Sequence, residues 1–153
     1  MKLLWKKQVD QPVERVFERF SDLANAADHV SGITNIEFLT DGPVGVGTRF
    51  KETRVMFGRE ATEEMTVTDF QPNQAYTIGC ESCGCEYRTE FRFHPHGAGT
   101  EVEIEMETRA LTLFAKILSP LSRLMAGTVK KCVDQDLEDL KVGLEANAST
   151  TAT

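Results

Sequence analysis

Residues 119–145 read SPLSRLMAGTVKKCVDQDLEDLKVGLE, and this closing stretch decides the fold. Its apolar residues recur at three- and four-residue spacing, which predicts one face of a helix: Leu121, Leu124, Met125, Val129, Cys132 or Val133, Leu137, Leu140 and Leu144. A helix of about 25 residues spans roughly 38 Å at 1.5 Å per residue, enough to cross a small domain. Its apolar face therefore needs a broad surface to pack against.

Six consecutive strands are predicted upstream, and they supply that surface: residues 33–39, 48–57, 60–70, 75–81, 85–94 and 100–109. The segments between them are rich in turn-forming residues: 41–47, 58–59, 71–73, 83–84 and 96–99. Short connections of this kind indicate an antiparallel meander. A sheet that buries the closing helix has to curve around it.

The chain begins with a predicted strand at 3–9 and a helix after Pro12, whose apolar stripe is Val13, Val16, Phe17, Phe20 and Leu23. A broken second helix is expected at 22–31. The predicted fold is α+β: one strand, two short helices, six strands, and a curved antiparallel sheet wrapped around a long C-terminal helix. We expect a single domain over residues 1–146 and a flexible, small polar tail at 147–153.

Composition narrows the class of partner. The 153 residues include 17 basic and 24 acidic ones, and the net charge of −7 argues against nucleic acid or an anionic membrane as the main partner. The sequence contains no apolar run long enough for membrane insertion. The N-terminus becomes charged too early for a signal peptide, so a cytoplasmic location with four reduced cysteines is expected.

Alternation along the strands predicts which side chains face the closing helix. The predicted inward, ligand-binding set is Phe50, Arg54, Met65, Tyr76, Ile78, Cys80, Tyr87, Thr89, Phe91, Met106 and Thr108, with Met125 from the helix. The strand at 48–57 is ambiguous, because Phe50 and Met56 place Arg54 inside whereas Val55 and Phe57 imply the opposite. An apolar wall with a few polar groups is typical of a small-molecule site. Plain core packing, or a bulge that turns the charges to solvent, is the alternative.

Two carboxylates on the predicted inward face, Glu63 and Glu52, are the candidate catalytic residues, each as a general acid or base. Arg54 or Tyr87 would then hydrogen-bond a carbonyl or enolate oxygen. The sequence contains no Ser-His-Asp order, phosphate-binding glycine loop or H-E-x-x-H helix. Among the histidines, only His29 is expected near a cavity mouth.

The segment 80–85, CESCGC, crosses a predicted hairpin turn. We expect Cys80 and Cys85 to be cross-strand neighbours, with Cys83 in the turn. A structural zinc site needs four ligands, and here only three cysteines lie together, with Cys132 on the closing helix as a distant fourth. The cysteines are therefore interpreted as small apolar residues, with no metal and no cofactor. Metal ligation by Cys80, Cys83 and Cys85, or a redox disulfide, stays an alternative.

This order of elements, together with several short motifs, resembles the START/Bet v 1-like superfamily (SRPBCC, polyketide cyclase/dehydrase-like). The motifs are VDQPVERVF at 9–17, VGVGTRF at 44–50, VTDFQPN at 67–73, GTEV at 99–102 and DLEDLK at 136–141. The resemblance covers residues 1 to about 146 and implies the helix-grip fold, with a cavity between sheet and helix. Many bacterial members carry a Trp after the first helix, where this chain has Asp28-His29-Val30.

The leading functional hypothesis is the binding or transport of a hydrophobic small molecule, such as a lipid, polyketide or aromatic compound. The alternative is a polyketide cyclase/dehydrase-type enzyme that uses a pocket carboxylate. A third hypothesis is a protein-interaction role for the acidic ladder Glu101, Glu103, Glu105 and Glu107. A homodimer stays open.

Overall fold

The computed structural model describes residues 1–56, 58–117 and 119–151, with side chains described over 1–56, 58–117 and 126–146. The first elements are β1 (Lys2–Val9), α1 (Val13–Ser21), η1 (Leu23–Asn25) and α2 (Ala26–His29). The strands that follow are β2 (Ile33–Phe38), β3 (Arg49–Met56), β4 (Arg59–Gln71), β5 (Ala75–Ser82), β6 (Cys85–His96) and β7 (Gly99–Ala110). The last helices are α3 (Leu113–Ile117) and α4 (Ser119–Thr151). This order confirms the predicted α+β fold, to which the structure adds α3.

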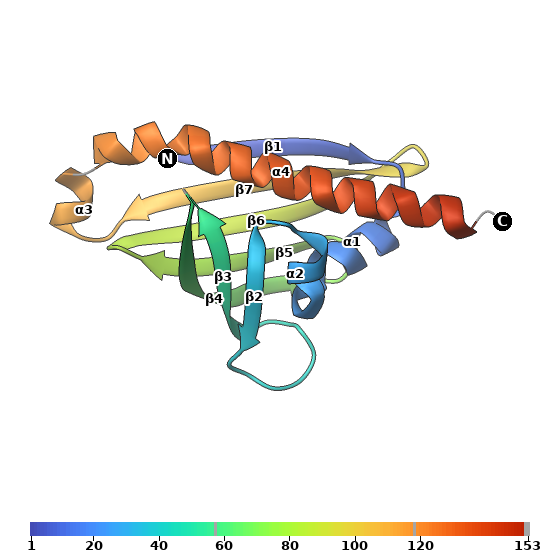
Figure 1. The fold of residues 1–153 in the computed structure, drawn as a ribbon, viewed down its shortest axis with the longest axis horizontal. Coiled ribbons are helices and arrows are strands. Elements are labelled where there is room, and N and C mark those ends of the chain that lie inside the picture. Colours follow the sequence, from blue (N-terminus) through green and yellow to red (C-terminus); the bar gives the residue numbers. More distant parts are fainter. Residues whose placement is uncertain (57, 118, 152–153) are drawn as a thin grey trace.

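The strands form one antiparallel sheet in the order β1-β7-β6-β5-β4-β3-β2. The N-terminal strand therefore pairs with the last strand, and β2 forms the opposite edge. Helix α4 runs along the sheet beside β1 and reaches α1 (Figure 1). No helix in the described ranges combines the length and apolarity needed to cross a bilayer.

Register shifts bend this sheet at two places, between Ile33 and Asn35 in β2 and between Val67 and Asp69 in β4. Irregularities of this kind increase local twist and curvature. In Figure 1, β2 and β3 consequently run steeply across the direction of β6 and β7. The sheet thus curves toward the helix, as expected.

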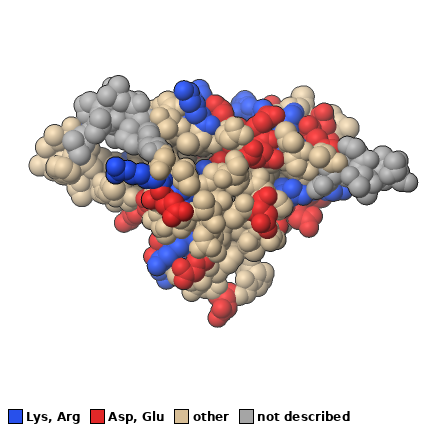
Figure 2. All heavy atoms as spheres, in the orientation of Figure 1, with Lys and Arg blue, Asp and Glu red and all other residues tan. Residues whose placement is uncertain are grey.

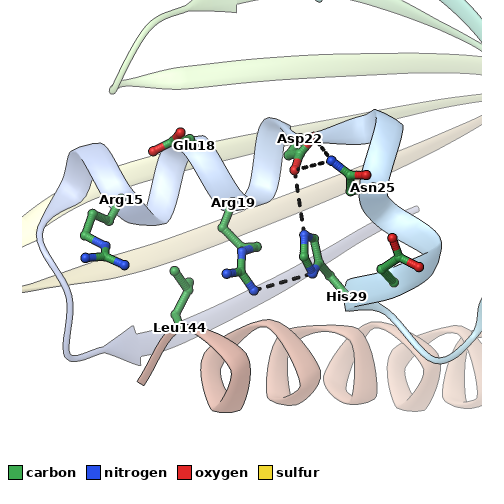
Figure 3. Close-up of a pocket in the computed structure, with 8 residues that line it drawn as sticks. Arg15, Glu18, Arg19, Asp22, Asn25, His29 and Leu144 are labelled. Carbon is green, nitrogen blue, oxygen red and sulfur yellow. Dashed lines mark hydrogen bonds and ion pairs between the residues drawn. The ribbon is translucent and has the colours of Figure 1, made fainter. Parts of the chain in front are cut away.

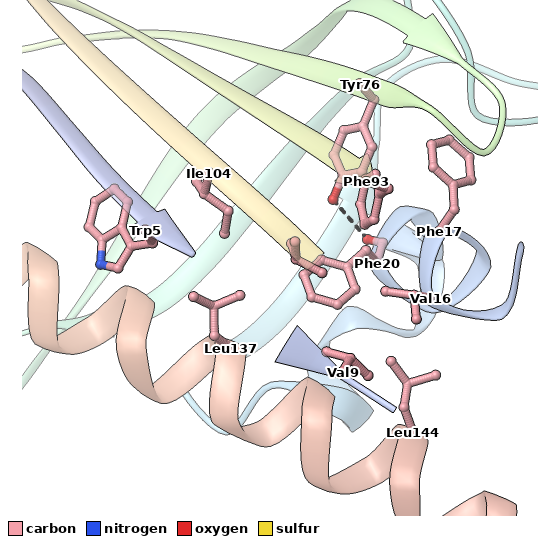
Figure 4. Packing of buried hydrophobic residues seen from close by; sticks show 11 residues of the cluster. Trp5, Val9, Val16, Phe17, Phe20, Tyr76, Phe93, Ile104, Leu137 and Leu144 are labelled. Carbon is pink, nitrogen blue, oxygen red and sulfur yellow. Dashed lines mark hydrogen bonds between the residues drawn. The ribbon is translucent and has the colours of Figure 1, made fainter. Parts of the chain in front are cut away.

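The main hydrophobic core joins α1, the sheet and the C-terminal half of α4 (Figure 4). The stripe predicted for α1 supplies Val16, Phe17 and Phe20, and α4 supplies Leu137 and Leu144. The rings of Phe17 and Phe93 meet edge to face, with centroids 5.2 Å apart. This end of the interior is filled by packed side chains.

Two details differ from the sequence predictions. Cys83 and Gly84 both have positive φ, 51° and 75°, and form a two-residue turn. Such a turn pairs the residues directly beside it, so Ser82 lies opposite Cys85 and Cys80 lies opposite Tyr87. The prediction that Cys80 and Cys85 are direct cross-strand neighbours was therefore wrong. Helix α4 also continues through residues 147–151, because an established helix gains a hydrogen bond with each added residue.

Candidate functional site

The register of the sheet shows which side chains face α4, because direct cross-strand partners share a face. One row across the sheet is Thr108, Tyr87, Cys80, Met65 and Phe50. The next row is Met106, Thr89, Ile78 and Val67. Tyr76 and Phe91 continue the same face and pack against the core cluster that contains Leu137 of α4. All predicted inward residues on these strands thus lie on the face covered by the helix.

Burial divides this face into two regions. Phe50 and Tyr76 are 0% and 3% exposed and belong to the packed core, where the Tyr76 hydroxyl donates a hydrogen bond to the Phe20 carbonyl over 3.1 Å. Toward the Cys83-Gly84 turn the inward side chains are only partly buried: Ile78, Cys80, Tyr87, Thr89, Phe91, Met106 and Thr108. Met65 is partly buried beside Phe50. Met125 lies outside the side chains that the structure describes.

Arg54 resolves the ambiguity of β3, because its guanidinium reaches the helix. It lies 2.9 Å from a carboxylate oxygen of Asp136 on α4 and 3.1 Å from one of Glu52. Each of these three side chains is at most a fifth exposed. Val55, by contrast, is exposed. Glu52 and Arg54 therefore face inward, and Arg54 ties the sheet to α4.

The environment of this charge cluster changes its acid–base properties. Burial raises the pKa of Asp136 to about 6, although the Arg54 guanidinium acts in the opposite direction. Burial lowers the pKa of Arg54, but attraction to Asp136 and Glu52 outweighs that effect and raises the pKa above its usual value. The cluster therefore holds one cation between two carboxylates, one of which gains a proton in mildly acidic solution.

A second polar group lies nearby on the same face. The Ser82 hydroxyl donates a hydrogen bond to Glu63 over 2.9 Å, and the Cys80 sulfur lies 4.0 Å from the other Glu63 oxygen. Glu63 is also the direct cross-strand partner of Glu52. Burial, reinforced by the charge of Glu63, raises the pKa of the Cys80 thiol to about 11. That thiol is protonated at neutral pH and is a poor nucleophile.

The four cysteines are free thiols. Across the ranges that the structure describes, His, Cys, Asp and Glu side chains form no group of three or more that could hold a metal ion. Cys83 is exposed in the turn, whereas Cys85 is buried. Burial raises the pKa of the Tyr87 hydroxyl, which therefore stays protonated and able to donate a hydrogen bond.

His29 lies in a different place from the inward face of the sheet. It accepts a hydrogen bond from Arg19 over 3.4 Å and lies 3.7 Å from Asp22 (Figure 3). These residues line a polar groove of about 420 Å³ between α1, α2 and Leu144 of α4. His29 is therefore part of a surface network.

The acidic ladder of β7 lies on the other face of the sheet. Lys6 and Arg92 pair with Glu103, and Lys2 and Arg92 pair with Glu105. These two ladder carboxylates thus have basic partners within the chain. They offer less unpaired charge to a protein partner than the sequence suggested.

Sequence reasoning missed Asp136 and Ser82 as members of the inward polar set. Asp136 lies four residues after Cys132 and four before Leu140, so its place on the apolar helix face was visible in the spacing. The position of Ser82 follows only from the strand register.

The curved antiparallel sheet that grips a long C-terminal helix, with polar groups on a largely apolar inner face, defines a Bet v 1-like, helix-grip protein. The chain belongs to the family described as Polyketide cyclase / dehydrase and lipid transport, whose model matches residues 6–145. The resemblance to the SRPBCC superfamily is thereby confirmed.

Several solved structures share the fold. Ara h 8.0201 has a TM-score of 0.75 at 13% identity, covering 95% of this chain and 98% of its own. TTHA0849 from Thermus thermophilus has 0.70 at 18% identity, covering 100% of both chains. The Zhui aromatase/cyclase from Streptomyces sp. R1128 has 0.77 at 15% identity, covering 97% and 95%. A search of curated proteins found no match.

Proposed function

We propose that this chain binds or transports a hydrophobic small molecule, such as a lipid, polyketide or aromatic compound, between the sheet and α4. The observation that carries the proposal is the change along the inner face from packed core to partly buried side chains. The partly buried region is mainly apolar and aromatic, as in Ile78, Phe91 and Met106. The four free thiols fit the cytoplasm as the place of action.

Polar groups on the same face would orient the ligand. The Glu63 carboxylate accepts one hydrogen bond from Ser82 and has further lone pairs for a ligand hydroxyl. The Tyr87 hydroxyl can donate to a carbonyl oxygen. Arg54 is already held by two carboxylates, so its role is to position the sheet against α4 rather than to bind the ligand.

Thr89→Trp tests this proposal. Thr89 lies between Ile78 and Met106 on the inner face, so a Trp side chain would occupy the space assigned to the ligand. We expect binding of an apolar fluorescent probe, 1-anilinonaphthalene-8-sulfonate, to weaken by about tenfold or more, equivalent to ~1.4 kcal/mol. Fluorescence titration measures the change.

The matched control is Arg88→Trp, because Arg88 is the preceding residue on β6 and is exposed on the opposite face. This variant should bind the probe as the parent chain does. Equal affinity of the Thr89 variant and the parent, with both folded, would remove the inner face as the binding site.

A second candidate function is catalysis of the cyclase/dehydrase type, with Glu63 as the general acid or base. The observation that favours Glu63 over Glu52 is that Glu52 is held by Arg54, whereas Glu63 contacts a neutral hydroxyl and a neutral thiol. The family description includes such enzymes.

Glu63→Gln separates the two functions. If the chain turns over a poly-β-ketone substrate, we expect the rate to fall by about 10²–10⁴-fold, the usual contribution of a positioned acid or base. Probe binding should persist, because the amide has nearly the shape of the carboxyl group. Glu64→Gln is the matched control, since Glu64 is exposed on the other face of β4. Undiminished turnover in the Glu63 variant would exclude this residue from the reaction.

A further inference from the structure

Helix α3 turns its large apolar side chains outward. Leu113, Phe114 and Ile117 are 76%, 71% and 68% exposed, whereas the small Ala115 is its buried residue at 5%. An ordinary surface helix buries its large apolar residues and exposes polar ones. This helix has the reverse arrangement, and exposed apolar groups gathered in this way mark an interaction site.

The outward face is held in place by the neighbouring hairpin turn. The backbone N–H of Leu111 donates a hydrogen bond to the Gly84 carbonyl over 2.8 Å. A Cβ atom at Gly84 would lie 2.7 Å from the Thr112 hydroxyl oxygen and 3.5 Å from the Ala115 Cβ, so the turn and the start of α3 are in close contact. Because the Ala115 side packs here, the three large apolar residues must point away from the domain.

The charge around α3 is opposite to that of the rest of the chain. Residues 108–133 contain five basic and no acidic residues, while the remainder contains twelve basic and 24 acidic ones. Arg109 pairs with Glu86, but Lys116, Lys130 and Lys131 are exposed. The net charge of −7, which argued against an anionic membrane, therefore hides a positive segment.

We propose that the α3 surface, formed by Leu113, Phe114, Lys116 and Ile117, docks on the surface of an anionic phospholipid bilayer. Apolar side chains of this kind enter the boundary between headgroups and acyl chains, and neighbouring lysines attract anionic headgroups. A second copy of the chain fits less well, because two positively charged faces would repel each other. Figure 2 shows uncharged atoms at the tip of the molecule that α3 occupies.

The position of α3 connects docking with ligand exchange. Helix α3 follows β7 directly and contacts the β5–β6 turn, at the end of the sheet where Tyr87 and Thr108 are partly buried. Docking would therefore bring the partly buried end of the interior to the bilayer. This connection rests on the proposed ligand-binding function, whereas the docking surface itself does not.

Vesicle flotation tests the docking surface. We expect the parent chain to float with vesicles of phosphatidylcholine and phosphatidylserine but not of phosphatidylcholine alone, and to be released by added salt. The combined substitution of Leu113, Phe114 and Ile117 by Ser should reduce the bound fraction about tenfold or more. Lys116→Glu should reduce it about fivefold. Val46→Ser is the control, because Val46 is 69% exposed in the loop before β3.

Three outcomes would overturn the proposal: no flotation of the parent chain, unchanged flotation of the triple variant, or a dimer in sedimentation that only the triple variant disrupts. The last outcome would assign the face to a second copy. Because the substituted side chains are exposed, circular dichroism should show an unchanged fold. Binding of the fluorescent probe, measured on the same variant without vesicles, should stay at the parent level, so failure of docking and failure of ligand binding are distinguishable.

Discussion

Replacing Arg54 by Ala is expected to lower the free energy of unfolding by about 3 kcal/mol at neutral pH, because it leaves two largely buried carboxylates without their cation. Urea denaturation followed by circular dichroism measures the loss. Arg49→Ala is the matched control on the same strand, since Arg49 pairs with Glu64 but half of its side chain is exposed. An exposed pair of this kind contributes about 0–1 kcal/mol.

The effect of the Arg54 substitution should depend on pH with a definite sign. The pKa of Asp136 in the folded chain is about 6, above its ordinary value of 3.8, so the folded state takes up this proton more readily than the unfolded state. Ionisation of Asp136 therefore reduces stability as the pH rises from about 4 to about 6, and removing Arg54 increases that cost. We expect a smaller loss at about pH 5 than at neutral pH. A loss that equals that of Arg49→Ala at every pH would contradict the assigned role of Arg54.

Leu144→Ala is expected to be the second most damaging substitution, with a loss of about 3 kcal/mol and a melting temperature roughly 10 °C lower. Leu144 is 2% exposed and belongs to the cluster in which α4 packs against α1 and β1. Truncating it removes apolar contact and leaves a cavity. Thermal unfolding followed by circular dichroism provides the measurement.

Val142→Ala is the control on the same helix, because Val142 is 56% exposed and its truncation should change stability by less than about 0.5 kcal/mol. If both variants unfolded at the same temperature, the C-terminal half of α4 would not be the anchor of the helix on the sheet.

Strand orientation was predictable where the sequence alternates without interruption. Residues 101–108 alternate acidic and less polar side chains, and the structure places them on opposite faces as expected. Strand β3 was ambiguous because Val55 and Arg54 both depart from a simple alternation. The ion pair of Arg54 with Asp136, 82 residues away, resolves the orientation.

Helix α3 was not predicted because the expected signal of a surface helix is an inward apolar stripe. Its five residues expose Leu113, Phe114 and Ile117, and a segment of this length is too short for a stable periodic pattern. Its direction depends on contact with the turn at Gly84, which is distant in sequence.

The amino-acid sequence by itself determined the order of helices and strands, the alternation of most strand faces and the apolar stripe of the closing helix. These features follow from local periodicity and turn chemistry. The tertiary structure alone decided that Arg54 meets Asp136, that Ser82 binds Glu63 and that α3 points outward. The physical reason is that these contacts depend on strand register and helix docking, which join residues that no short-range pattern relates.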